Sequence, residues 1–234
     1  MKTLLLRLSQ WCSAKLPPQA YCSGAHSKES RTPLLIVVEG PHDVEFLRRV
    51  SAILHRHDAK LPDLARAEAA GQLAFLPAGG GNLWAWSHRL TAFEAFEFHL
   101  YDRETSPVSE QRQQLVDAIN IRPNCQAVLT RKRALENYLH PLAIQQAGGV
   151  QIQFTDDDSV PLLVAQSAYR LHGSDVAWAD LSQRARKRRC ERAKVWLNRR
   201  AVECMTAELL SDRDPAGEVA SWLGIIATLL AAGR

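Results

Sequence analysis

Short apolar runs alternate along the chain with segments whose apolar residues recur at helical spacing. The runs predict four strands, at residues 34–38, 73–76, 97–101 and 126–129. Helical spacing predicts helices within residues 44–54, 83–90, 108–119, 160–171, 180–200, 201–210 and 218–230, and a short one within 58–71. Strands that alternate with helices are typical of a parallel sheet with crossover helices. The pattern therefore predicts an α/β fold, Rossmann-like, with a central parallel sheet flanked by helices and a C-terminal helical extension.

The same pattern predicts three parts. Residues 1–32 mix polar residues with little periodicity, which predicts a poorly ordered N-terminal extension with a short helix near residues 4–11. Residues 33–155 form the predicted core, with an edge strand at 150–154. Residues 156–234 form the predicted helical C-terminal part.

The first predicted strand is apolar throughout and ends in two carboxylates. Glu39 follows it directly, Gly40 and Pro41 turn the chain, and Asp43 stands at the start of the next helix. Open α/β sheets bind ligands at the carboxyl ends of their strands, so this pair is a candidate site. The alternative is that Glu39 is a strand-end charge and Asp43 a helix N-cap.

A second acidic pair follows the third predicted strand. Asp102 and Glu104 are two residues apart, so in extended backbone both side chains point the same way. Like charges are costly to gather unless a cation lies between them, and Mg²⁺ prefers carboxylate oxygens. Two such pairs at two strand ends favour a divalent metal site over isolated surface charges.

Three glycines separate the second predicted strand from its helix. Gly80 and Gly81 can bring backbone N–H groups close to a phosphate, and the alternative is a flexible turn. No Gly-x-x-x-x-Gly-Lys-Ser/Thr sequence occurs, which argues against a nucleotide-hydrolysing P-loop.

Composition adds the expected compartment. The chain has 234 residues, of which 46% are hydrophobic, and a formal net charge of +4. Its five cysteines are scattered without a Cys-x-x-Cys pair, which argues against a disulfide framework or a zinc site and favours a reducing cytoplasm. The leucine cluster near the N-terminus is too short for a signal peptide, and no run is long enough for a membrane span.

Together these motifs resemble a TOPRIM domain. A strand followed by Glu-Gly-x-x-Asp, a glycine-rich turn, and a strand ending in an acidic pair occur here in that order, and Glu-Asn-Tyr-Leu at 136–139 is similar to nucleases of the OLD (overcoming lysogenization defect) family. The resemblance covers residues 34–140 and implies a standalone TOPRIM nuclease domain without the ATPase of full-length OLD proteins. One departure is Glu104, where the family has an aspartate.

The resemblance also implies residue roles. Glu39 is expected to act as the acid/base residue or to share a metal, and metal ligands are expected at Asp43, Asp102, Glu104 and Glu136. The alternative for Glu136 is a solvated helix-surface glutamate.

The predicted C-terminal part contributes weaker candidates. Asp156, Asp157 and Asp158 are either additional metal ligands or, together with Thr155, a cap for the next helix. Lys194 matches a lysine that OLD-type domains carry near the metal, where it can stabilise charge on a phosphate, but it can also be an ordinary surface lysine.

A basic segment lies between residues 184 and 200. It favours a nucleic-acid contact over a merely solvated helix face. Its positive charges are Arg184, Arg186, Lys187, Arg188, Arg189, Arg192, Lys194, Arg199 and Arg200, against Glu191 alone.

We therefore expect a Mg²⁺- or Mn²⁺-dependent endonuclease that cuts nucleic acid, with DNA as the favoured substrate. A separate ATPase subunit and a homo-oligomer are further expected partners, and a membrane is not. The alternative is a non-catalytic DNA-binding or regulatory module that acts with such an ATPase. Primase or topoisomerase chemistry is a third reading, against which the chain offers no zinc-binding module and no recognisable topoisomerase tyrosine domain.

Overall fold

The computed structural model describes residues 32–173 and 176–233. The predicted N-terminal extension and its short helix lie outside these residues, apart from Thr32. Every element below belongs to the unit that begins at Arg31.

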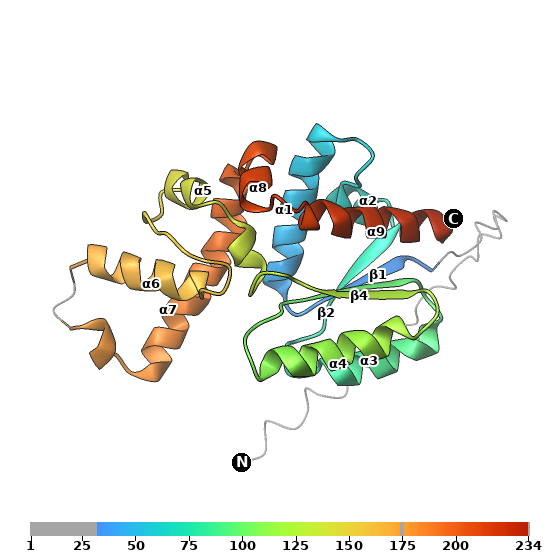
Figure 1. Ribbon diagram of the computed structural model, residues 1–234, viewed down its shortest axis with the longest axis horizontal. Coiled ribbons are helices and arrows are strands. Elements are labelled where there is room, and N and C mark those ends of the chain that lie inside the picture. The colour runs from blue at the N-terminus through green and yellow to red at the C-terminus, as the bar shows by residue number, and fades with distance from the viewer. Residues whose placement is uncertain (1–31, 174–175, 234) are drawn as a thin grey trace, which may run out of the picture. The chain divides into compact units, whose positions relative to one another are not determined.

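A four-stranded parallel sheet forms the centre of the fold (Figure 1). Its strands lie in the order β2-β1-β3-β4, and the register pairs Val37 of β1 with both Leu76 of β2 and His99 of β3. The predicted α/β fold with a parallel central sheet is confirmed. The strands are β1 (Leu34–Val38), β2 (Leu73–Pro77), β3 (Glu97–Tyr101) and β4 (Cys125–Leu129).

Helices cover both faces of the sheet, because the central strand β1 is apolar on both sides. On β1, Ile36 and Val38 pack into one core and Val37 into the other, and all three are fully buried. The face of Ile36 is covered by α1 (Pro41–His57), α2 (Leu64–Ala69) and α9 (Glu218–Ala232), and the opposite face by α3 (Leu83–Leu90) and α4 (Val108–Asn120) (Figure 1).

The chain after β4 adds helices beside the sheet. The short 3-10 helix η2 (Leu135–Tyr138) and α5 (Pro141–Gln146) lead into α6 (Val160–Leu171) and α7 (Gln183–Trp196), which pack against each other. A π-helical turn, η4 (Leu197–Ala201), continues α7, and α8 (Ala207–Arg213) precedes α9. The larger core contains buried residues from β1 and from α7, η4 and α9 together.

Three predicted elements differ from the structure. Residues 150–154 form no strand; Val150 and Ile152 are buried in the larger core while the segment pairs with no sheet edge. The helix predicted at 180–200 begins at Gln183 and ends in the π-helical turn. The helix predicted at 201–210 is divided, since a 3-10 turn (Val202–Cys204) ends before Thr206, whose side chain caps α8.

No single helix among the described residues is long and apolar enough to cross a membrane. In the part of the chain that the structure describes, α8 and α9 meet that criterion of length and composition when taken together, and they are bent by 111°.

Candidate functional site

The site lies where the strand order reverses. Chain connections carry β2 to one side of β1 and β4 to the far side of β3, so the carboxyl ends of β1 and β3 flank a topological switch point. Glu39 and Asp102 are the first residues after these two strands. They are in direct contact: the backbone N–H of Asp102 donates to Glu39 Oε1 at 3.2 Å.

The other oxygen of Glu39 accepts a hydrogen bond from Arg112 of α4. Arg112 Nη2 lies 2.9 Å from Glu39 Oε2, and both side chains are largely buried. Burial raises the pKa of Glu39 to about 7, although the Arg112 charge opposes this shift. Glu39 can therefore exchange a proton near neutral pH.

Asp43 is buried in the first turn of α1. It is not the N-cap, as the alternative interpretation had it; Gly40 occupies that position, and Asp43 Oδ2 accepts from Gly40 N at 2.8 Å. The carboxyl group is almost inaccessible, and burial raises its pKa to about 6, opposed by the charge of Lys194. The charge of Lys194 therefore acts on Asp43 as it does on the strand-end carboxylates Glu39 and Asp102.

Asp102 and Glu136 form the most deeply buried part of the site. Asp102 Oδ1 accepts from the backbone N–H of Leu135 at 3.0 Å, which ties β3 to η2. Burial, together with the charges of Asp43 and Glu136, raises the pKa of Asp102 well above its usual value. Glu136 is 1% exposed, and its Oε1 accepts from Asn198 Nδ2 at 2.6 Å. The predicted alternative, a surface Glu136, is wrong.

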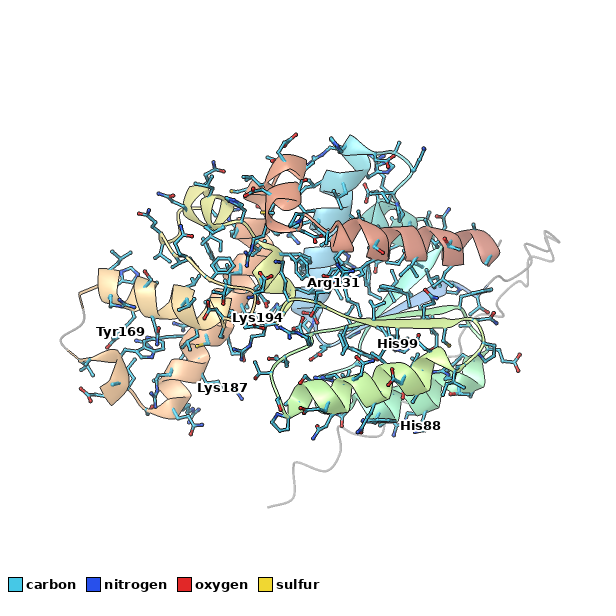
Figure 2. All side chains as sticks on the ribbon, in the orientation of Figure 1. His88, His99, Arg131, Tyr169, Lys187 and Lys194 are labelled. Atoms are coloured by element: carbon cyan, nitrogen blue, oxygen red, sulfur yellow. The ribbon has the colours of Figure 1, made fainter. Side chains whose placement is uncertain are left out.

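Lys194 supplies the positive charge among these carboxylates. Its Nζ lies 3.6 Å from Glu136 Oε1 and 3.9 Å from Asp102 Oδ2. Burial alone would lower the pKa of Lys194, but the charges of Glu136 and Asp102 outweigh it and hold the pKa above its usual value. Figure 2 shows Lys194 between α7 and the end of the sheet, so it is not an ordinary surface lysine.

Glu104 departs from the predicted geometry. Its φ of 58° is left-handed, so the chain leaves the extended conformation and the side chain does not follow Asp102. Its Oε2 lies 3.4 Å from Arg133 Nε. Glu104 nevertheless lines a pocket of about 170 Å³ together with Glu136 and Lys194, so it lies at the edge of the cluster.

The three consecutive aspartates are engaged within the protein, two with basic side chains and the third with Thr155. Asp156 Oδ1 accepts from Lys132 Nζ at 2.6 Å, and Asp157 pairs with Arg103. Asp158 accepts from the backbone and side chain of Thr155, both at 2.7 Å. The alternative prediction that one of these aspartates or Thr155 caps α6 is wrong, because Ser159 occupies the N-cap position of that helix.

The two candidate glycines differ in their surroundings. A Cβ on Gly80 would lie 3.3 Å from Glu39 Oε2, whereas one on Gly81 would have no atom within 4 Å. Gly80 therefore allows the loop after β2 to approach the site.

The candidate arginines Arg186, Arg188 and Arg189 all lie on α7, the helix that carries Lys194. Arg188 is exposed, Arg186 is partly exposed, and Arg189 contacts the ring of Tyr169. Their predicted role in nucleic-acid binding stays a prediction.

Arg112 and Asn198 complete the site and were not predicted. Nothing in the sequence distinguishes Arg112 from the other polar residues of its helix. Asn198 stands four residues after Lys194, a spacing that places both on one face of a helix, and this was the available signal. Its Oδ1 is buried and has no hydrogen-bond partner among the described residues.

The donor chemistry suits a hard divalent cation. Carboxylates that follow β1 and β3 gather here with carboxylates of α1 and η2. Burial raises the pKa of three of them, a shift that a bound cation would reverse. Within the described part of the chain, however, no three His, Cys, Asp or Glu side chains already form a group that could hold a metal ion. To bind a metal, these carboxylates would have to turn away from the ammonium group of Lys194 and toward the cation.

Comparison with known proteins found no matching family model, no matching curated protein and no matching solved structure.

Proposed function

We propose that this protein is a Mg²⁺- or Mn²⁺-dependent phosphodiester hydrolase that cuts nucleic acid, of the TOPRIM type found in the OLD family. The observation that carries this proposal is the convergence of Glu39, Asp43, Asp102, Glu136 and Lys194, from five elements, at the switch point of a parallel sheet. The basic helix α7 beside the cluster supports a polyanionic substrate.

Each residue has a role that its surroundings support. Asp43, Asp102 and Glu136 would hold the cation, with Glu104 at the edge of the site. The cation would polarise the phosphate and lower the pKa of a bound water. Glu39, whose pKa is about 7, is the residue suited to accept and return a proton, and Lys194 to stabilise negative charge on the phosphate.

The test is cutting of supercoiled plasmid and of single-stranded circular DNA with Mg²⁺ or Mn²⁺. We expect the wild type to cut and Asp102→Asn to lose the activity, while Asp117→Asn, on the exposed face of α4, cuts normally. Equal cutting by wild type and Asp102→Asn, or cutting by neither, would exclude the proposed reaction.

One observation favours a second function, a DNA-binding or regulatory module that acts with a separate ATPase. Lys194 already pairs with Glu136 and Asp102, in the position where a metal would otherwise supply positive charge. Calorimetric titration with Mg²⁺ separates the two: the hydrolase binds the cation and Asp43→Asn weakens it, whereas the module binds none. For either function we propose a cytoplasmic location, which the free thiols of Cys125, Cys190 and Cys204 support.

A further inference from the structure

A cavity separate from the acidic cluster lies between α6 and α7. Its volume is about 640 Å³, within the roughly 300–1,000 Å³ typical of small-molecule sites. The space exists because small side chains, Ala165, Ala168 and Ala193, stand at the contact between the two helices.

The aromatic wall of the cavity is held firmly in place. The indole of Trp196 lies against Gly149, where a Cβ would come within 2.3 Å of Trp196 Cη2. Tyr169 donates a hydrogen bond to the carbonyl of Val176 at 2.7 Å and packs edge-on against Trp178. Contacts within the protein thus orient both aromatic side chains.

Two arginines contribute positive charge to the lining of the cavity. Arg189 lies over the ring of Tyr169 at 4.9 Å, and Arg192 also lines the cavity. Within residues 32–173 and 176–233, neither arginine forms a salt bridge. An apolar and aromatic lining, with two arginines that form no salt bridge, suits a flat, aromatic ligand that carries negative charge.

The cavity is close to the acidic cluster along the same helix pair. Val160 lines the small pocket with Glu136 and Lys194, while Val164 lines the large cavity. These valines are one helical turn apart, about 6 Å along the helix axis, which is within the reach of one or two nucleotides. Figure 2 shows Tyr169 on the same helix pair as Lys194, farther from the sheet.

We infer that this cavity binds one unstacked base of a single-stranded nucleic acid whose backbone runs along α7. This inference rests on the proposed function, since it names the form of the substrate. Stacking on aromatic side chains and cation contacts to the backbone are how proteins hold single strands. A duplex could not offer a base to the cavity without opening.

The test compares two fluorescein-labelled oligomers of equal length and charge, an oligothymidylate and an oligomer of abasic sites. Binding is measured by anisotropy in EDTA, where no cleavage occurs. We expect the wild type to bind the oligothymidylate at least about 5-fold more tightly, because stacking of a base is lost in the abasic oligomer. Ala168→Trp, which fills the cavity, should bind both oligomers with the affinity that the wild type has for the abasic one.

Ala65→Trp, on the exposed face of α2, is the matched control and should keep the base preference. In case Ala168→Trp does not fold, photo-crosslinking of a bromouracil oligomer to the wild type should label the peptide with Tyr169 or the peptide with Trp196. Crosslinks elsewhere, or equal affinity of the wild type for both oligomers, would overturn the inference. Binding of dodecanoate that Ala168→Trp abolishes, without any base preference, would overturn it in favour of a fatty acid.

These outcomes are independent of the proposed hydrolysis. A protein that prefers bases but never cuts would exclude only the hydrolase. A protein that cuts with Mg²⁺ but binds both oligomers equally would exclude only the base-binding cavity.

Discussion

Lys194 Nζ lies 3.6 Å from Oε1 of Glu136, a carboxylate that is 1% exposed. The ammonium group and a divalent cation would therefore compete for the same oxygens. The Lys194 charge reduces the repulsion between the buried carboxylates when no metal is bound. A divalent cation must therefore displace Lys194 from these oxygens to bind.

Replacing Lys194 should separate these two effects. We expect Lys194→Met to lower the free energy of unfolding by about 2 kcal/mol, since removing one partner of a buried pair costs on the order of 3–5 kcal/mol and Lys194 is only partly buried. Added Mg²⁺ should then raise the melting temperature of Lys194→Met more than that of the wild type. Lys187→Met, exposed on the same helix, is the control. Equal Mg²⁺ shifts in all three proteins would contradict the competition.

The two glycines after β2 provide a matched pair. A Cβ at Gly80 would lie 3.3 Å from Glu39 Oε2, so Gly80→Ala should displace this carboxylate and slow plasmid nicking by about 10-fold, given that a misplacement of about 1 Å can cost about 100-fold. Gly81→Ala meets no atom within 4 Å and should cut at the wild-type rate. Equal rates for both variants would show that the position of Glu39 does not limit the reaction.

The sequence was sufficient to predict those site residues whose positions follow from the topology of the backbone alone. Glu39 and Asp102 come directly after apolar runs, and parallel strands bring their carboxyl ends to one edge, so these two could be placed from pattern. Glu104 could not, because its left-handed φ depends on the loop that packs against Arg133. Arg112 was missed because its contact with Glu39 arises from how α4 packs, which no local spacing encodes. The spacing of Asn198 from Lys194 places both on one helix face, but it does not show that this face meets Glu136.

Gly149 should be a structural requirement of the cavity. A Cβ there would lie 2.3 Å from Trp196 Cη2 and 2.5 Å from the carbonyl oxygen of Ile144, so Gly149→Ala should destabilise the protein by about 2 kcal/mol through overpacking. Gly224→Ala, within α9 and with no atom within 4 Å, should instead stabilise by up to about 1 kcal/mol. Urea denaturation of both variants measures the difference, and loss of stability in neither would show that Trp196 moves freely.

The protein should become less stable as the pH decreases, because of a row of buried, hydrogen-bonded side chains on β3. His99 Nε2 and Glu97 Oε2 lie 2.7 Å apart, and Arg122 Nη2 lies 2.7 Å from Glu97 Oε1. Burial lowers the pKa of His99; burial alone would raise the pKa of Glu97, but His99 and Arg122 outweigh it and the pKa is lowered. In both cases the unfolded chain binds protons first, so the stabilisation is lost as pH falls below the ordinary values of 6.5 for His99 and 4.5 for Glu97.

The variant His99→Gln isolates the first of these steps. It should be less stable than the wild type at pH 7, and its free energy of unfolding should change less between pH 7 and about 5.5, because the histidine no longer titrates. Chemical denaturation at a series of pH values measures both slopes. A variant whose slope equals that of the wild type would show that His99 titrates equally in the folded and unfolded chains.

The basic face of α7 should set how nucleic-acid binding depends on salt. If Arg186 and Arg188 each contact a phosphate, Arg186→Gln and Arg188→Gln should each reduce the slope of log affinity against log salt by about 1, because one fewer counterion is released. Arg56→Gln, exposed near the end of α1, removes the same charge elsewhere and should leave the slope unchanged. Anisotropy titrations of single-stranded DNA in EDTA at several salt concentrations give these slopes without interference from cleavage. An equal reduction in all three variants would mean that only net charge attracts the strand, and α7 would then have no direct contact with its backbone.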